Sequence, residues 1–244
     1  MDTLTGTVAI VTGASFGIGE GIAKMLSAEG VKVALVARRH TELQRVAEDI
    51  CNQGGTALVA PADLRDEHAL NKVVEQTRNA LGPIDILVNS GGVFHVSPIH
   101  ETDMRAWDAT LEVNLRAPTV LCAAALPGMR ERRRGYIINI ASEAGVFVYG
   151  GYGAYAISKH ALRVLTELIQ EENQSFGVKA WAICPGLVDT PLAGWATGAN
   201  PADFLTVEEV VGVARFLLAQ GANVKMGPEI RIGTTRNPFR MTYG

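Results

Sequence analysis

The segment from residue 8 to residue 19 reads VAIVTGASFGIG, and the architecture expected for the whole chain follows from it. It begins with a short apolar run that favours a buried strand and leads into the apolar periodicity of a helix. Three glycines between a strand and a helix allow a tight turn, close approach of the backbone to a diphosphate, and close packing of the helix on the strand. Their spacing, G-x-x-x-G-x-G, differs from the common G-x-G-x-x-G fingerprint, and a turn that merely tolerates glycine is the alternative interpretation.

Short apolar runs alternate with longer amphipathic segments along the rest of the chain. The strand-like runs are residues 8–11, 33–36, 57–60, 84–88, 136–140, 180–183 and 229–232. Helical periodicity occurs at residues 18–28, 41–50, 67–81, 104–129, 154–173 and 207–219. Runs that are apolar without alternation indicate strands buried on both faces, and intervening helices supply the crossovers of a parallel sheet. We therefore predict an α/β fold: one domain, residues 1–244, with a doubly wound parallel sheet covered by helices on both faces.

Composition excludes several classes of protein. The chain has 244 residues, 48% hydrophobic and 19% charged, with a formal net charge of -3, which predicts a soluble globular protein and no nucleic-acid or membrane partner. Cys51, Cys122 and Cys184 are widely spaced and the histidines are scattered, so neither a disulfide framework nor a metal site is expected. We see no signal peptide and no apolar run long enough to span a bilayer, so we expect the cytoplasm.

Tyr155 and Lys159 stand four residues apart in the helix predicted for residues 154–173. Residues at this spacing share a helix face, so the phenol and the ammonium reach the same volume. A free phenol titrates near about 10, and an adjacent cation favours phenolate and brings the group toward the working range of an acid or base. Such a pair is also common as a half-buried aromatic ring beside a solvated lysine, and that is the alternative when the pair is considered alone.

Several motifs occur in the order and at the spacing of the short-chain dehydrogenase/reductase family, which the chain resembles over its whole length. They are T-G-x-x-x-G-x-G at residues 12–19, Asn89-Ser90-Gly91-Gly92 in place of N-N-A-G, Asn114, Ser142 ahead of Tyr155-x-x-x-Lys159, and Pro185-Gly186-x-x-x-Thr190. The resemblance implies a Rossmann-type fold and a nicotinamide-dependent transfer of hydride between an alcohol and a carbonyl group.

The resemblance assigns catalytic roles to four residues. Tyr155 would exchange a proton with the substrate oxygen, and Ser142 would hydrogen-bond that oxygen. Lys159 would bias Tyr155 electrostatically and bind the nicotinamide ribose, while Asn114 would hold a water that connects Lys159 to solvent. Without the resemblance, Asn114 could cap or cross-link backbone, and Ser142 could be a turn hydroxyl.

The end of the second predicted strand bears on the choice of cofactor. An acidic residue there would bind the adenosine ribose and repel a phosphate, but this chain has Ala37 followed by Arg38 and Arg39. A guanidinium suits a phosphate, so we predict NADP(H), with Arg38 as the preferred contact; NAD(H), with a solvated arginine pair, is the alternative. Phe16 argues against NADP(H), because many NADP-dependent relatives carry a basic residue at its position.

The resemblance also implies a full set of cofactor contacts, with Asp63 at the adenine and Val188 and Thr190 at the carboxamide. The set is Gly13, Ser15, Phe16, Gly17, Ile18, Gly19, Arg38, Arg39, Asp63, Leu64, Asn89, Gly91, Tyr155, Lys159, Pro185, Gly186, Val188 and Thr190.

A substrate pocket is expected beyond the carboxyl ends of the strands. Phe94 and His95, residues 143–146, and a loop at about residues 190–205 that could close as a lid should form it, although a surface position is the favoured interpretation of His95. The candidate functions are an NADPH-dependent carbonyl reductase similar to 3-oxoacyl-carrier-protein reductases, an NAD-dependent dehydrogenase of a sugar, polyol or steroid-like alcohol, and a dinucleotide-binding regulator without turnover.

The resemblance also bears on assembly and on partner proteins. Relatives pair the helices that carry the asparagine and the tyrosine, so a homotetramer or homodimer is expected. Four arginines between residues 130 and 134 indicate a solvated helix end, with docking of an acidic acyl carrier protein as the alternative. Ser90 within the N-N-A-G motif and the sequence that follows Gly233 depart from the family pattern without touching the catalytic set.

Overall fold

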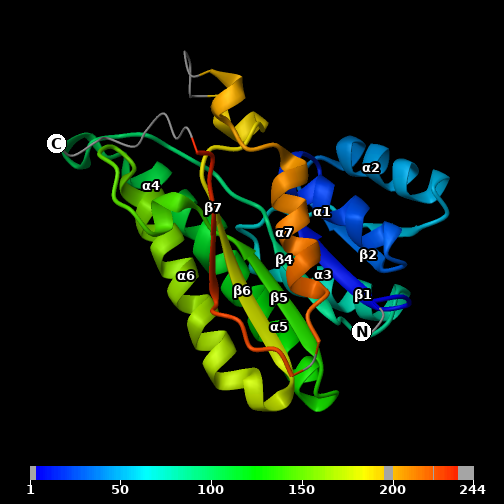
Figure 1. Ribbon diagram of the computed structural model, residues 1–244. Coiled ribbons are helices and arrows are strands. Elements are labelled where there is room, and N and C mark those ends of the chain that lie inside the picture. The colour runs from blue at the N-terminus through cyan, green and yellow to red at the C-terminus, as the bar shows by residue number, and fades with distance from the viewer. Residues whose placement is uncertain (1–3, 195–199, 222, 236–244) are drawn as a thin grey trace.

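The computed structural model describes residues 4–194, 200–221 and 223–235, and these ranges form a parallel seven-stranded sheet in the order β3-β2-β1-β4-β5-β6-β7 (Figure 1). The strands are β1 (Val8–Thr12), β2 (Lys32–Val36), β3 (Thr56–Val59), β4 (Ile86–Asn89), β5 (Gly135–Ile140), β6 (Val178–Pro185) and β7 (Glu229–Ile232). This confirms the doubly wound parallel sheet. The strand β6 is longer than predicted, because Val178 pairs with Gly135 of β5 and Pro185 pairs with Ile232 of β7.

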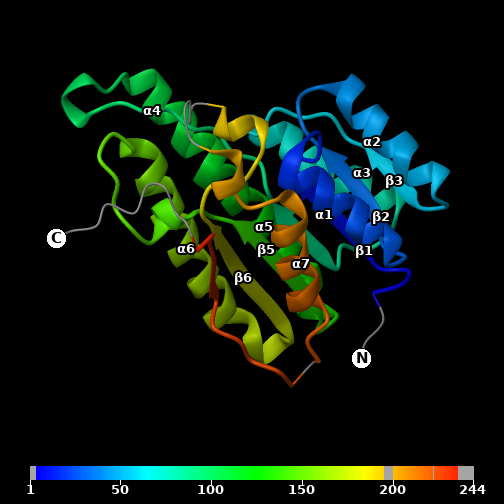
Figure 2. The same ribbon diagram turned by 45° about the horizontal axis from the view of Figure 1, so that its top comes forward.

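Helices cover both faces of the sheet, as predicted (Figure 2). They are α1 (Gly17–Ala28), α2 (His40–Asn52), α3 (Glu67–Ala80), α4 (Met104–Leu111), α5 (Ala117–Glu131), α6 (Gly153–Asn173) and α7 (Val207–Leu218). The apolar faces of α1, α2 and α7 form one core with the sheet, and those of α3, α5 and α6 form a second core on the other face. In β1, Ala9 and Val11 belong to the first core and Ile10 to the second, which is why this strand is apolar without alternation.

The continuous helix predicted for residues 104–129 is interrupted by a π-helical turn, η2 (Glu112–Arg116). In this turn the N–H of Ala117 donates to the carbonyl of Glu112, five residues back instead of four. Pro118 explains the position of the turn, since it has no N–H to donate to the carbonyl of Asn114. The α-helical ladder therefore opens at Asn114, one of the predicted catalytic residues.

The connections place the glycine segment where the strand order reverses. From β1 the chain moves outward to β2 and β3, then returns to β4 on the opposite side of β1. Such a switch point is where open parallel sheets bind ligands, outside the carboxyl ends of their strands. These ends point to the top of Figure 1, where the short turns η5 (Pro191–Ala193) and η6 (Pro201–Asp203) stand above them. Across the described ranges, none of the helices has the length and apolarity that crossing a membrane requires.

Candidate active site

A cavity of about 460 Å³ opens at the switch point and brings most of the predicted site residues together. Its volume lies within the range of small-molecule and cofactor sites. The predicted cofactor and catalytic residues that line it are Gly13, Ser15, Phe16, Gly17, Ile18, Arg38, Arg39, Asp63, Leu64, Gly91, Ser142, Tyr155, Lys159, Pro185, Gly186, Val188 and Thr190.

Three predicted residues do not line this cavity. A Cβ on Gly19 would collide with the carbonyl of Gly13, so Gly19 serves the close packing of α1 on the end of β1. The side chain of Asn89 is 2% exposed and donates to Asn139 Oδ1 at 2.8 Å, inside the protein. Asn114 is also fully buried and lies behind the cavity wall.

The turn of residues 13–19, which we call the glycine cradle, packs against the end of β4. Gly13 has a φ of +66°, and a Cβ there would approach the Gly91 nitrogen to 2.8 Å. The hydroxyl of Thr12 accepts the N–H groups of Ser90 and Gly91, both at 3.1 Å. Ser90, which replaces an asparagine of the family pattern, thus joins the two strand ends through its backbone. Gly13 and Gly17 both line the cavity, and a glycine turn at a helix N-terminus fits the diphosphate of a dinucleotide.

Charged groups gather at the end of the cavity beside β2. Arg38 and Arg39 follow the strand, and the Arg39 guanidinium carbon lies 4.4 Å from the centroid of the Phe16 ring. A hydrogen bond from the Arg65 guanidinium lowers the pKa of Asp63 to about 2, and the charge of Arg38 adds to this effect. The carboxylate expected at the adenine is therefore ionised at neutral pH and held in a fixed position.

Tyr155 is buried at the centre of the cavity wall, with 8% of its surface exposed. Burial raises its pKa, and a hydrogen bond with the Ser142 side chain opposes the increase. Ser142 precedes the short turn η3 (Glu143–Gly145) and accepts the N–H of Ala144 at 3.1 Å, which fixes the serine side chain. Ser142 is therefore both a turn hydroxyl, which was the alternative interpretation, and a hydrogen-bond partner of Tyr155.

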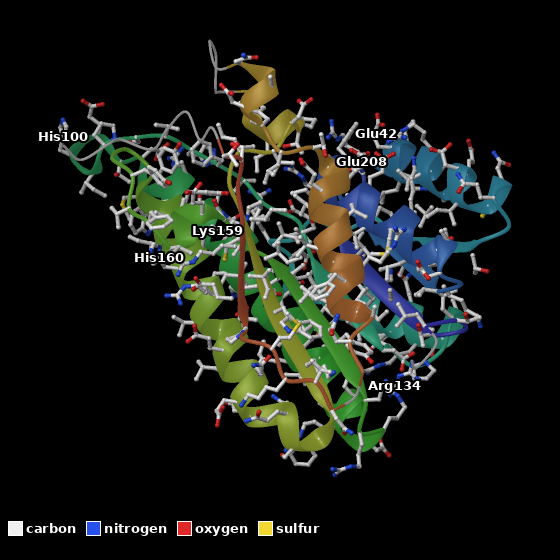
Figure 3. The ribbon with its side chains drawn as sticks, in the orientation of Figure 1. Glu42, His100, Arg134, Lys159, His160 and Glu208 are labelled. Atoms are coloured by element: carbon white, nitrogen blue, oxygen red, sulfur yellow. The ribbon has the colours of Figure 1, made fainter. Side chains whose placement is uncertain are left out.

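Lys159 lies on α6 against the sheet, toward the upper ends of the strands in Figure 3, and is 4% exposed. Burial lowers its pKa to about 8. Its Nζ donates to the carbonyl of Ile140 at 2.7 Å and lies 5.7 Å from the centroid of the Tyr155 ring. The helix spacing thus placed the phenol and the ammonium together as expected. The pKa of Tyr155 is nevertheless raised and not lowered, because burial outweighs its other interactions.

Asn114 cross-links backbone next to the lysine. Its Oδ1 accepts the N–H of Val93 and its Nδ2 donates to the Val93 carbonyl, each at 2.9 Å. A second donor contact of Nδ2 reaches Ser158 Oγ at 3.1 Å. A Cβ built on Gly92 would lie 3.5 Å from Asn114 Oδ1 and 3.7 Å from Lys159 Nζ, so both side chains adjoin this glycine. The Asn114 side chain thus cross-links backbone, which was the alternative interpretation. Its catalytic role, to hold a water next to Lys159, stays a prediction.

An aromatic wall next to Tyr155 was not foreseen in full. Phe94 packs edge-on against Tyr155 and Tyr152, with ring centroids 4.6 Å and 4.9 Å apart, and Tyr149 lies 5.3 Å from Tyr152. We define the aromatic wall as Phe94, Tyr149 and Tyr152, all of which line the cavity. Burial raises the pKa of Tyr152 to about 12, so its hydroxyl stays neutral. The density of tyrosines in residues 149–155 was the available signal.

Other residues expected at the substrate end divide into two groups. Glu143, Ala144, Leu192 and Ala193 line the cavity. His95 does not line it, and its Nδ1 lies 3.1 Å from Thr110 Oγ1. The base of the predicted loop is closed by backbone bonds, from Asp189 N–H to Leu205 O at 2.9 Å and from Leu205 N–H to Leu187 O at 2.8 Å. Trp195 and Gly198, considered parts of a lid, lie outside the described residues.

Known proteins share this fold and sequence pattern. Residues 7–199 match the short chain dehydrogenase family. An uncharacterised oxidoreductase of Staphylococcus saprophyticus is 37% identical over 227 residues, covering 93% of this chain and 97% of that protein. One from Staphylococcus aureus strain MW2 is 33% identical over 228 residues, covering 93% and 96%. The crystal structure of an alcohol dehydrogenase from the archaeon Thermococcus sibiricus, complexed with 5-hydroxy-NADP, matches with a TM-score of 0.86 at 26% identity, covering 94% of this chain and 97% of that chain.

The fold and the cavity at its switch point define a dinucleotide-binding oxidoreductase. The chain belongs to the short-chain dehydrogenase family, whose members act on CH–OH and C=O groups with NAD(P). The resemblance in the sequence motifs is thereby confirmed.

Proposed function

We propose that this protein is an NADP(H)-dependent oxidoreductase that interconverts a carbonyl group and a secondary alcohol, with Tyr155 as the acid and base. The arrangement that carries the proposal is the hydrogen-bonded pair of Tyr155 and Ser142, with Lys159 beside it, in one cavity with the glycine cradle. A proton donor thus adjoins the place where a dinucleotide would end and a substrate would begin.

The protonation of the site suits carbonyl reduction. When bound, the nicotinamide would supply or accept the hydride. The raised pKa keeps the proton on Tyr155 at neutral pH, ready for the substrate oxygen, and Ser142 would hold that oxygen by a hydrogen bond. Below a pH of about 8 the ammonium of Lys159 is charged and would stabilise the phenolate that remains after the transfer. Alcohol oxidation would use the same groups in reverse.

Asn114 would position a water behind Lys159. The backbone carbonyl oxygen of Asn114 cannot accept the usual helical hydrogen bond, because residue 118 is proline and has no N–H. This oxygen can therefore accept a hydrogen bond from a water. We propose this oxygen, and not the buried amide, as the atom that would link Lys159 to solvent.

The choice of NADP(H) rests on the charges next to β2. Ala37 offers no carboxylate that would repel a phosphate, and Arg38 and Arg39 both line the cavity. The Thermococcus alcohol dehydrogenase, which has the same fold, is complexed with an NADP derivative. NAD(H) is the alternative cofactor.

The aromatic wall favours a bulky apolar carbonyl compound over a sugar or polyol, because its rings offer broad apolar faces next to Tyr155. Docking of an acyl carrier protein on the arginines is disfavoured. Arg130 stacks on Phe176 at 3.8 Å, and Arg132 donates to the Ile84 carbonyl at 2.6 Å. The neighbouring Arg134 is at the lower end of the sheet in Figure 3, far from Lys159.

A homotetramer or homodimer built through α6 is our proposal for the assembly. Ile157, Val164 and Leu168 lie along one side of this helix and are 49%, 46% and 52% exposed. Burial of such a stripe against a second copy would remove apolar surface from water. Sedimentation equilibrium tests this, and a monomer would refute it. The cytoplasmic location and the single domain of residues 1–244 stay predictions.

The test of the proposed function compares Tyr155→Phe with Tyr136→Phe, which removes a buried hydroxyl in β5 away from the cavity. NADPH and NADH binding would be measured by fluorescence, and turnover by NADPH consumption with cyclic ketones, aromatic ketones, diketones and 3-oxoacyl thioesters. We expect Tyr155→Phe to lose turnover by about a thousandfold or more while keeping NADPH binding, and Tyr136→Phe to keep both. Unchanged turnover in Tyr155→Phe would sink the assignment. Tight NADPH binding without turnover on any substrate would favour the regulatory alternative.

A further inference from the structure

Phe16 occupies the turn between β1 and α1, where its ring faces two arginines from the next βα unit. The guanidinium carbon of Arg39 lies 4.4 Å from the ring centroid, and that of Arg45 lies 5.9 Å away. Phe16 itself is the N-cap residue of α1 and lines the cavity together with Arg39. The ring therefore connects the glycine cradle to the basic residues that follow β2.

The two arginines have different electrostatic surroundings. Arg45 donates to both carboxylate oxygens of Glu20, at 2.9 Å and 2.6 Å, and to the carbonyl of Ser15 at 3.2 Å. Its charge is compensated, and its contact with Ser15 steadies the glycine cradle. Among the described residues, the Arg39 side chain forms no hydrogen bond and no ion pair. Its guanidinium lies over the face of the Phe16 ring.

Stacking on a ring leaves the guanidinium suited to bind an anion. A cation that rests on an aromatic face keeps its full positive charge, and the N–H groups at the edge of the guanidinium plane remain able to donate to phosphate oxygens. Arg38 differs, because its charge acts on the carboxylate of Asp63. Arg39 is thus the better prepared of the two residues to receive a phosphate.

We propose that Phe16 is a specificity-determining residue for the cofactor, because its ring holds Arg39 where the ribose phosphate of NADP(H) would bind. The inference rests on the proposed NADP(H) function and assigns the selectivity to the pair of Phe16 and Arg39. Phe16 stands where many NADP-dependent relatives carry a basic residue, and it contributes a positive charge indirectly, by positioning a guanidinium from the neighbouring βα unit. NADH, which lacks the phosphate, would gain little from this pair.

The test is a double-mutant cycle on the dissociation constants of NADPH and NADH, measured by fluorescence and calorimetry with the whole chain. Phe16→Leu removes the aromatic face, Phe16→Tyr keeps it, and Arg39→Met removes the charge. Phe176→Leu is the matched control, since Phe176 carries the same kind of stack with Arg130 at 3.8 Å, outside the cavity. Thermal melts of all variants would confirm that each is folded.

We expect Phe16→Leu to weaken NADPH binding by about two- to fivefold, the range of an exposed cation–π contact, and NADH binding by less than about 1.5-fold. Phe16→Tyr and Phe176→Leu should keep the preference of the parent protein. Arg39→Met should weaken NADPH binding by about tenfold, and Phe16→Leu should have no further selective effect in that variant.

Two results would overturn the inference. One is an equal loss of NADPH and NADH affinity in Phe16→Leu, and the other is a selective effect of Phe16→Leu that persists in the Arg39→Met variant. Failure of the parent protein to prefer NADPH would instead refute the proposed cofactor and the inference with it. The parent measurement therefore separates the two failures.

Discussion

Lys159→Met should make the cofactor-free protein more stable at neutral pH while it abolishes catalysis. The Lys159 ammonium is 4% exposed, and among the described residues its Nζ donates to one backbone carbonyl, that of Ile140. Burial lowers the pKa of this lysine from its ordinary value of 10.5 to about 8. The folded protein therefore carries a charge that it disfavours, and methionine removes that charge with little change of side-chain length.

The magnitude follows from the shift in pKa. A lysine whose folded pKa falls from 10.5 to about 8 destabilises the native state by about 3 kcal/mol below pH 8. Between pH 8 and pH 10.5 the folded chain has released the proton and the unfolded chain still holds it, so the stability of the parent protein rises with pH. Above pH 10.5 the full penalty is gone. The variant also loses the bond to Ile140, which costs about 1–3 kcal/mol at every pH. We therefore expect a net gain of about 0–2 kcal/mol at pH 7 for the variant.

The assay is urea unfolding of both proteins at pH 7, 8, 9 and 10, with the difference in unfolding free energy plotted against pH. This difference should shift by about 2–3 kcal/mol in favour of the parent protein between pH 8 and 10. Lys32→Met is the control, because Lys32 is exposed at the start of β2, and its difference should stay flat. Parallel stability curves for the parent and Lys159→Met would refute the reasoning.

Two further substitutions test local structure, one in the glycine turn and one at the start of α7. Gly13→Ala should cost more than about 2 kcal/mol and weaken dinucleotide binding, because at a φ of +66° its Cβ would lie 2.8 Å from the Gly91 nitrogen; Gly54→Ala, at a φ of +83° with nothing within 4 Å, should cost only about 1 kcal/mol in the same unfolding assay. Equal costs would contradict the close approach. Thr206→Ala should lower the melting temperature by about 2–4 °C, because it removes the capping box with Glu209 at the start of α7. An unchanged melting temperature would show that this cap contributes nothing.

The parallel sheet, the strand–turn–helix of residues 8–19 and the meeting of Tyr155 with Lys159 could be predicted because they depend on local patterns, whereas most of the other cavity residues followed from the family resemblance. The apolar run before Thr12 and the glycines after it place a strand end and a helix start next to each other, and the structure puts both at the switch point. The spacing of Tyr155 and Lys159 likewise brought the two side chains into one wall. These outcomes need only the periods of helices and strands.

The π-helical turn could not be predicted from hydrophobic periodicity, because a single such turn inserts one residue once and leaves the α-helical period unchanged on either side. Pro118 was the available signal, and its effect on the carbonyl of Asn114 becomes clear only once the helix is placed. The direction of the pKa shift of Tyr155 depends on burial by segments distant in sequence, Phe94 among them. Spacing predicts which groups meet, whereas burial decides which protonation state is stable.

Burial of polar groups has two different meanings in this molecule, and their partners distinguish them. Asn139 is fully buried, donates to Thr166 Oγ1 at 2.8 Å and accepts from Asn89 at 2.8 Å, so its polar atoms are satisfied and it joins β4, β5 and α6. Lys159 is also buried, yet it is an ionisable group whose single carbonyl partner in the described ranges does not neutralise its charge. A satisfied amide is explained by the stability of the fold alone. A buried lysine whose pKa is lowered to about 8 destabilises the fold, so the stability of the fold does not explain its presence. A functional role would explain it, and this is the physical reason to propose that the chemistry takes place beside Lys159.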